Sequence, residues 1–195
     1  MTLAAQPNLV PGHAYRTCDL LAWSRNPSRL AQRLVTEGKL REAAHGLYYA
    51  PVPTWFGPAP ATDDDVLRAF FKGGRFVISG PPSWNALGLG STVLFAATLV
   101  YNTQRTGQFV FDGRRFLLRR VLFPDRSPPE WFIVDLLQHH EMAGLALLDL
   151  ATALTAQLSA GRWNRTVLRQ MAEEYAKKAT LALVNGCLAN ARGAA

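Results

Sequence analysis

Residues 26–38 constrain the fold most, because this segment carries the signals for both ends of a helix. Asn26 can accept a backbone N–H as an N-cap. Pro27 suits the first helical position, where its missing N–H costs nothing and its fixed φ fits the helix. Gly38 can adopt the left-handed conformation that commonly ends a helix. The sequence therefore predicts a helix from Pro27 to Glu37.

The predicted helix has two chemically different faces. With about 100° between successive residues, four apolar side chains share one arc. These are Leu30, Ala31, Leu34 and Val35. The opposite arc is polar and holds Arg29, Gln32, Arg33 and Thr36. No acidic residue occurs between Arg25 and Thr36. A helix with such a face fits the DNA major groove, where Arg and Gln read guanine and adenine edges.

The flanking residues predict a winged helix-turn-helix over residues 1–50. We expect a short first helix capped by Thr17 or Asp19, a turn at 24–26, and wing strands at 39–41 and 47–49 around His45–Gly46. A strand at 14–16 would join the wing, and Pro7, Pro11 and Gly12 leave room only for a helical stub at Thr2–Gln6. Lys39 and Arg41 on the wing would meet phosphates.

An ordinary solvated helix would also show a basic face. The agreement of cap, apolar period, stop and wing favours DNA binding over that alternative. The chain carries a net charge of +7, with an excess of basic residues both before and after residue 60, so a polyanionic partner is plausible for either half.

The segment 51–62 holds four prolines and is predicted to be a stiff linker, with Trp55 and Phe56 pinning it to a domain surface. The remainder, 63–195, is predicted to be a mixed α/β domain that ends in helices, so the fold class is α+β. We expect helices at 62–71, 83–87, 130–141, 145–159, 163–176 and 177–190, and strands at 76–79, 94–101, 109–111 and 116–123.

Two distant cysteines, Cys18 and Cys187, match no metal spacing and are expected to be small buried residues in a reducing compartment. The N-terminus lacks the basic and apolar regions of a signal peptide, and no run of about 18 apolar residues predicts a membrane span. We therefore expect a soluble cytoplasmic protein without membrane contact.

No strong catalytic motif is present, so we expect neither an enzyme nor a cofactor. Residues 88–92 form a partial glycine-rich run that lacks the features of a nucleotide-binding loop. Asp63–Asp65 fit an acidic first helical turn better than a metal site. His139–Glu141 lack the spacing of a zinc protease, although Asp135 lies four residues before His139 on a possible shared face.

A second set of basic residues occurs in the C-terminal part. It comprises Arg105, Arg114, Arg115, Arg119, Arg120, Arg165 and Arg169. The strand period divides the hairpin arginines between two faces. Edge-strand charges that discourage aggregation and contacts to phosphate or a partner are equally compatible with this pattern.

The N-terminal pattern YRTCDLL…NPSRLAQRLVTEGKLREAAHGLYYAP resembles the AbiEi-type antitoxins of bacterial abortive-infection toxin–antitoxin systems. The phrases FVISGPPSWNALGLGSTVLF, LVYNTQRTGQF, RRFLLRRVLFP and EWFIVDLLQHHEMAG resemble one branch of the same antitoxins, so the resemblance spans about residues 14–190. By position, it implies DNA contacts from Arg25, Asn26, Ser28, Arg29, Gln32, Arg33, Lys39 and Arg41.

The resemblance implies a phage-defence role in which the winged helix binds inverted repeats in its own promoter and represses the operon. The C-terminal domain would counteract a cognate nucleotidyltransferase-like toxin. Two alternatives remain open at this point. One is a stand-alone winged-helix transcriptional regulator whose second domain senses a ligand through Trp84, Trp131 and the aromatic strands. The other is an enzyme that acts on nucleic acid.

Overall fold

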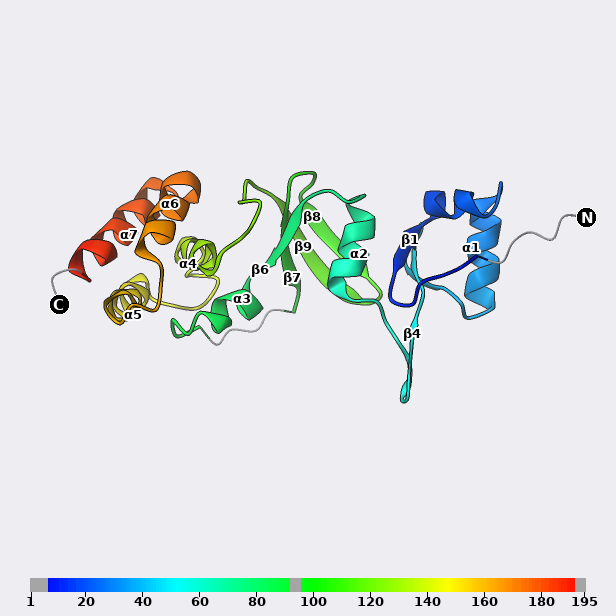
Figure 1. Ribbon diagram of the computed structural model, residues 1–195, viewed down its shortest axis with the longest axis horizontal. Coiled ribbons are helices and arrows are strands. Elements are labelled where there is room, and N and C mark those ends of the chain that lie inside the picture. The colour runs from blue at the N-terminus through cyan, green and yellow to red at the C-terminus, as the bar shows by residue number, and fades with distance from the viewer. Residues whose placement is uncertain (1–6, 92–95, 192–195) are drawn as a thin grey trace, which may run out of the picture. The chain divides into compact units, whose positions relative to one another are not determined.

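The computed structural model describes residues 7–91 and 96–191 and contains both helices and strands, which confirms the α+β class. The chain folds into two compact units (Figure 1). Unit 1 comprises Met1–Phe76 with Thr106–Phe116, and unit 2 comprises Val77–Arg105 with Leu117–Ala195. The helical stub expected at Thr2–Gln6 lies outside the described residues.

Unit 1 begins with a small three-stranded sheet and two helices that share one core. Its elements are β1 (Ala14–Arg16), η1 (Thr17–Ala22), α1 (Pro27–Thr36), β2 (Arg41–Ala44), β3 (Leu47–Tyr49), β4 (Val52–Thr54), β5 (Gly57–Ala59) and α2 (Asp63–Phe70). The sheet has the order β1-β3-β2 and is antiparallel, as predicted for the strand that joins the wing. Leu20, Leu30 and Leu34 are buried in the core that η1 and α1 form with the sheet.

Both predicted ends of α1 are confirmed. The Asn26 side chain accepts a hydrogen bond from the Arg29 N–H at 3.1 Å, and Pro27 begins the helix. At the other end Gly38 has a φ of 71°, and the N–H groups of Gly38 and Lys39 donate to the carbonyls of Val35 and Leu34. This pattern of two bonds around a left-handed glycine is a Schellman motif, which stops the helix where the sequence predicts.

Three local predictions in this region are wrong. The strand expected at 39–41 begins only at Arg41, because the N–H groups of Lys39 and Leu40 both donate to the Leu34 carbonyl. The first helix is capped by Arg16, whose backbone N–H donates to the Asp19 carboxylate. Val35, expected in the core, is 37% exposed because it lies at the edge of the apolar arc.

The predicted linker 51–62 contains an antiparallel hairpin of β4 and β5, which extends away from the rest of unit 1 (Figure 1). Trp55 and Phe56 occupy its tip and are 96% and 98% exposed, so they pin no surface. The division between units also differs from the predicted boundary. Helix α2 packs against β1 and β3, and this contact keeps it in unit 1.

The remaining elements include a four-stranded sheet of order β6-β7-β9-β8. They are β6 (Phe76–Ser79), α3 (Pro81–Ala86), β7 (Thr98–Asn102), β8 (Gly107–Phe111), β9 (Arg114–Arg120), α4 (Pro129–Gln138), α5 (Leu147–Ser159), α6 (Arg165–Tyr175) and α7 (Lys178–Asn190). The predicted strand 94–101 corresponds to β7, although residues 94 and 95 lie outside the described part. Asp112 and Gly113 both have positive φ, as the two-residue turn between β8 and β9 requires.

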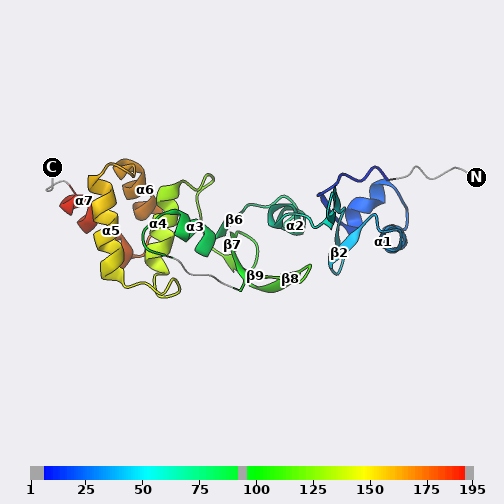
Figure 2. The same ribbon diagram turned by 90° about the horizontal axis from the view of Figure 1, so that it is seen from below.

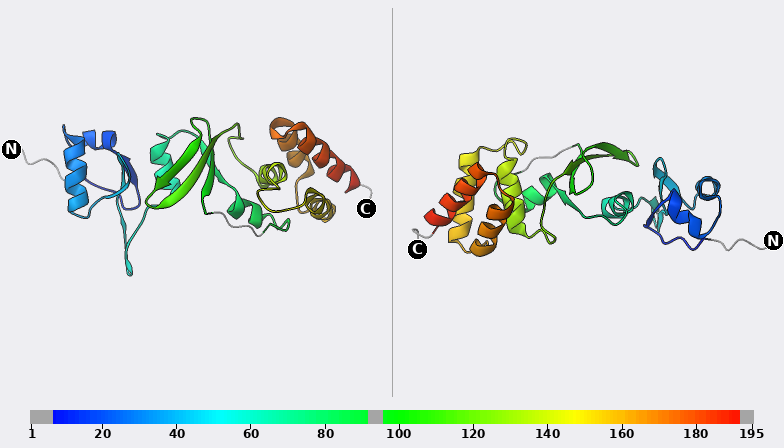
Figure 3. Two further views of the ribbon diagram at one scale, coloured as in Figure 1. Left: turned by 180° about the vertical axis from the view of Figure 1, so that it is seen from behind. Right: turned by 90° about the horizontal axis from the view of Figure 1, so that it is seen from above.

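Helices α4, α5, α6 and α7 pack side by side in unit 2 (Figures 2 and 3). Their apolar faces enclose the largest core, in which Trp84, Ile133 and Leu154 are fully buried. Cys187 lies in this core as predicted, whereas Cys18 is exposed on η1 and contradicts the expectation of burial. Across the described ranges, no helix is both long enough and apolar enough to span a membrane.

Candidate nucleic-acid interface

The polar face of α1 is exposed in unit 1, opposite the side that packs on the core. Arg29, Gln32, Arg33 and Thr36 are all exposed, while Leu30, Ala31 and Leu34 are buried. Two side chains on the polar face bond within α1 or to its end. Thr36 Oγ1 donates to the Gln32 carbonyl at 3.0 Å, and Arg33 Nε lies 3.6 Å from a Glu37 carboxylate oxygen. Because the apolar face of α1 is packed in the core, the polar groups on the opposite face are held in solvent at helical spacing.

The turn before α1 is fixed by short-range hydrogen bonds. Ser24 Oγ accepts from the Asn26 N–H at 3.1 Å and donates to the Asn26 carbonyl at 3.3 Å. Arg25 and Ser28 are exposed beside this turn. For Arg25 and Arg29, no ion pair is found with any acidic residue in the described ranges. Their guanidinium groups are thus available to an external anion.

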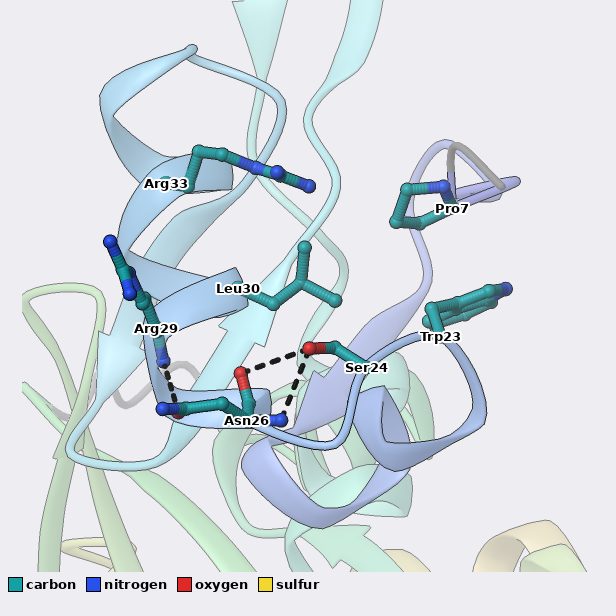
Figure 4. Close-up of a pocket in the computed structure, with 7 residues that line it drawn as sticks. All are labelled: Pro7, Trp23, Ser24, Asn26, Arg29, Leu30 and Arg33. Carbon is teal, nitrogen blue, oxygen red and sulfur yellow. Dashed lines mark hydrogen bonds between the residues drawn. The ribbon is translucent and has the colours of Figure 1, made fainter. Parts of the chain in front are cut away.

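A hollow of about 450 Å³ lies beside the N-terminal half of α1 (Figure 4). Arg29 and Arg33 project from the helix on one side of it, and Trp23 lies on the other side, with Leu30 between them. The complete lining is Pro7, Trp23, Ser24, Asn26, Arg29, Leu30 and Arg33. The hollow therefore combines an aromatic ring, hydrogen-bonding groups and two cations.

Glu37, which the sequence predicts only as the last residue of the helix, is an acidic residue beside the basic face of α1. Its carboxylate lies 2.8 Å from Lys39 Nζ and 3.6 Å from Arg33 Nε. The hydrogen bond from Lys39 is the largest influence on Glu37, and together with the nearby positive charges it lowers the pKa of the carboxyl group. Glu37 thus partly neutralises two of the predicted DNA contacts. The sequence signal for this role is the position of Glu37, one residue before the helix-ending Gly38.

Arg41, the other predicted wing contact, is exposed at the start of β2 but lies beside a buried hydroxyl. Tyr49 is fully buried, and its hydroxyl donates to Asp112 at 2.9 Å. Burial is the main cause of the raised pKa of Tyr49, and Arg41 opposes that rise. Arg41 therefore interacts with the Tyr49–Asp112 pair, whereas Arg29 is exposed to solvent.

The arginines of the predicted second basic set lie in different surroundings. Arg114 is partly buried and pairs with Asp63 at 2.5 Å in unit 1. Arg165 donates to the carbonyls of Leu158, in the last turn of α5, and Ala191, directly after α7, so its role is structural. Arg119 lines a pocket of unit 2. Arg105, Arg115, Arg120 and Arg169 are exposed.

The acidic and histidine-containing motifs have structural partners. Thr62 caps α2, Asp63 binds Arg114, and Asp64 binds Arg68, which agrees with an acidic first turn. No cluster of three or more potential metal ligands occurs within residues 7–91 and 96–191. His139 ends α4 as expected and also pairs with Asp135 at 3.0 Å.

No protein-family model and no curated protein matches this chain. Among solved structures, the crystal structure of the RV2827C protein from Mycobacterium tuberculosis is similar, with a TM-score of 0.56 at 13% sequence identity. The match covers 92% of this chain and 72% of that chain. At this identity the likeness concerns the fold alone, and it agrees with a mixed helical and stranded architecture.

Proposed function

We propose that the first part of unit 1 is a winged helix-turn-helix that binds duplex DNA, with α1 as the recognition helix. The observation that carries the proposal is the exposed face of α1, where Arg29, Gln32 and Arg33 stand on a helix capped at both ends. Arg and Gln make bidentate contacts to guanine and adenine in the major groove. In this proposal Lys39 and Arg41 contact phosphates along the wing.

The hollow beside α1 supports the same proposal. A backbone phosphate next to the helix would meet the guanidinium groups of Arg29 and Arg33 together with the polar turn at Ser24 and Asn26. Phosphate contacts of this kind fix the orientation of a protein on the duplex, while base contacts supply specificity. The pairing of Arg33 with Glu37 is exposed, so solvent screens it and a phosphate or base can compete for Arg33.

We further propose that the protein is a cytoplasmic, DNA-binding antitoxin of an abortive-infection system. It would repress its own operon through inverted repeats and counteract a nucleotidyltransferase-like toxin through unit 2. The support is the resemblance of long phrases in both units, namely NPSRLAQRLVTEGKLREAAHGLYYAP and EWFIVDLLQHHEMAG. No residue of the C-terminal part is assigned a catalytic role.

The DNA-binding proposal is tested by fluorescence anisotropy with a labelled fragment of the protein's own promoter and a scrambled fragment. Arg29→Ala combined with Arg33→Ala is expected to weaken promoter binding by about 5- to 160-fold for each lost base contact, since such contacts contribute about 1–3 kcal/mol. Arg126→Ala, which removes an exposed arginine in unit 2, is the matched control. Equal promoter affinity of the double variant and the wild type would show that α1 is not the recognition helix.

The antitoxin proposal is tested separately by co-expression with the neighbouring gene, which the proposal expects to encode a nucleotidyltransferase-like toxin. The Arg29→Ala, Arg33→Ala variant is expected to lose promoter repression while it still restores growth, because its unit 2 is unchanged. Growth arrest that persists with the wild-type protein would contradict the antitoxin role. That outcome would leave the DNA-binding result standing, so the two proposals fail independently.

A further inference from the structure

Unit 2 contains a pocket of about 450 Å³ that the proposed DNA interface does not use. Its walls come from β7, β9, α4 and α6 and from the segments that follow β9 and α6. The lining residues are Tyr101, Arg119, Val121, Leu122, Trp131, Asp135, Gln138, His139, Glu174, Tyr175 and Lys177. The volume falls within the range of about 300–1,000 Å³ that is typical of small-molecule sites.

Asp135 anchors one wall of this pocket and is only 3% exposed. One carboxylate oxygen accepts from Ser79 Oγ at 2.5 Å and Trp84 Nε1 at 2.9 Å. The other accepts from Tyr101 Oη at 2.8 Å and lies 3.0 Å from His139 Nδ1. All four partners converge on a buried carboxylate, so its orientation is fixed.

This arrangement also orients His139. Its Nδ1 lies 2.9 Å from the Asp135 carbonyl as well as 3.0 Å from the carboxylate, and both of these groups can only accept. Nδ1 must therefore carry a proton, and the opposite ring nitrogen, Nε2, points away from Asp135. Nε2 has no hydrogen-bond partner among the residues described. The hydrogen bond to Asp135 is the main cause of the raised pKa of His139, while burial acts in the opposite direction.

Two further cations line the same pocket. Arg119 enters from β9 and lies near enough to His139 to lower its pKa, and Lys177 follows α6. The acidic residues are Asp135, whose carboxylate is saturated by its four partners, and Glu174, which accepts a hydrogen bond from Gln170 at 3.0 Å. Arg119 and Lys177 are therefore the groups of the pocket that can donate to an external anion, and the Nε2 of His139 can donate as well when the ring carries both protons.

The rim of the pocket is apolar. Leu122 is 86% exposed and Val121 is 38% exposed. Both line the pocket, so a ligand bound there could cover them. Trp131 forms part of the wall and packs edge-on against Tyr101, with ring centroids 5.9 Å apart. A ligand with a flat apolar body would remove Leu122 from water, and burial of apolar area contributes about 25 cal/mol per Å².

We propose that this pocket binds a small organic carboxylate carried on an aromatic body of about two rings. Arg119 holds the carboxylate, the Nε2 of His139 donates to it when the imidazole carries both protons, Lys177 supplies further positive charge, and Val121 and Leu122 cover the ring system. The site is independent of the DNA interface, because all of its residues belong to unit 2.

The test is isothermal titration of the full chain with three probes: 2-naphthoate, the neutral 2-naphthalenemethanol and acetate. Naphthoate is expected to bind at least about tenfold more tightly than either of the others, because charge-assisted hydrogen bonds and ring burial act together. Arg119→Gln is expected to lower naphthoate affinity by about tenfold and to reduce the preference over the alcohol by the same factor. Arg115→Gln, an exposed arginine on the same strand that lies outside the pocket, should leave it unchanged.

Lys177→Gln is the second variant, because Lys177 is exposed and its removal leaves the core intact. It is expected to weaken naphthoate binding in the same direction as Arg119→Gln. Equal affinity for naphthoate and the neutral alcohol would overturn the assignment of a carboxylate site. Acetate binding as tight as naphthoate would overturn the role of the apolar rim, and unchanged affinity in both variants would place any binding elsewhere.

Discussion

Replacing Asp135 with asparagine removes the charge at the centre of unit 2 while it preserves the shape of the side chain. An asparagine oxygen can serve only one of the two positions that the carboxylate fills. If the amide NH₂ replaces the oxygen near Trp84, two N–H groups face each other at about 2.9 Å. If it replaces the other oxygen, it faces His139 Nδ1. The hydroxyls of Ser79 and Tyr101 can rotate to adapt, but one N–H is always opposed.

The expected destabilisation follows from these contacts. One buried unsatisfied donor costs about 1–3 kcal/mol, and each of the three remaining bonds loses about 1 kcal/mol when its acceptor becomes neutral. The sum is about 4–6 kcal/mol, which overlaps the cost of about 3–5 kcal/mol for breaking a buried ion pair. Urea unfolding monitored by tryptophan fluorescence measures the change, because Trp84 and Trp131 both lie in this core.

Asp149→Asn is the control for this experiment, because Asp149 is an exposed carboxylate in the first turn of α5. Its loss should cost less than about 1 kcal/mol through the helix dipole. If Asp135→Asn lowered the free energy of unfolding no more than this control, the buried carboxylate would not organise unit 2. Asp135 would then not fix the orientation of His139 either.

Three further outcomes are expected. Glu37→Gln should tighten DNA binding at low salt in an anisotropy titration, because it frees Arg33 and Lys39, and unchanged affinity would exclude both from the interface. Lys39→Ala should weaken binding to all sequences alike and reduce the salt slope by about one unit, whereas a change in sequence preference would contradict a phosphate contact. The free energy of unfolding should fall as pH rises above 6.5, the ordinary pKa of histidine, and through the raised pKa of His139, because the folded state holds that proton more tightly. Asp135 raises the pKa of His139 and Arg119 lowers it. His139→Gln should remove this pH dependence of stability, and an unchanged pH profile in the variant would contradict the role of His139.

Local signals were sufficient to predict α1. The cap at Asn26, the proline after it and the left-handed Gly38 each act within a few residues, so the sequence alone contains the information. The strand that follows was misplaced for a related reason. The helix-ending motif uses the amides of Lys39 and Leu40, and a strand pattern read from side chains does not reveal where backbone N–H groups are already committed.

The hairpin at the prolines and the pocket of unit 2 required tertiary information. Prolines argue against a strand, but β4 and β5 form an isolated pair in which missing N–H groups can face solvent. Ser79, Trp84, Tyr101 and Asp135 come from separate elements spread over the chain and show no common spacing. Only the Asp135–His139 interval was visible in the sequence, and the sequence favoured a helix-end histidine over an Asp–His pair.

Unit 1 is built from two stretches of chain that are separated by residues 77–105. The later stretch supplies Asp112, whose N–H donates to the Ala43 carbonyl and whose carboxylate accepts from Tyr49. It also supplies Arg114, the partner of Asp63. Truncation after residue 50 or 62 would therefore leave Tyr49 without its acceptor. Unit 1, for which we propose DNA binding, can therefore not be separated from the chain by a single cut, and transfer of residues 1–62 alone would require rebuilding the surface that the returning hairpin covers.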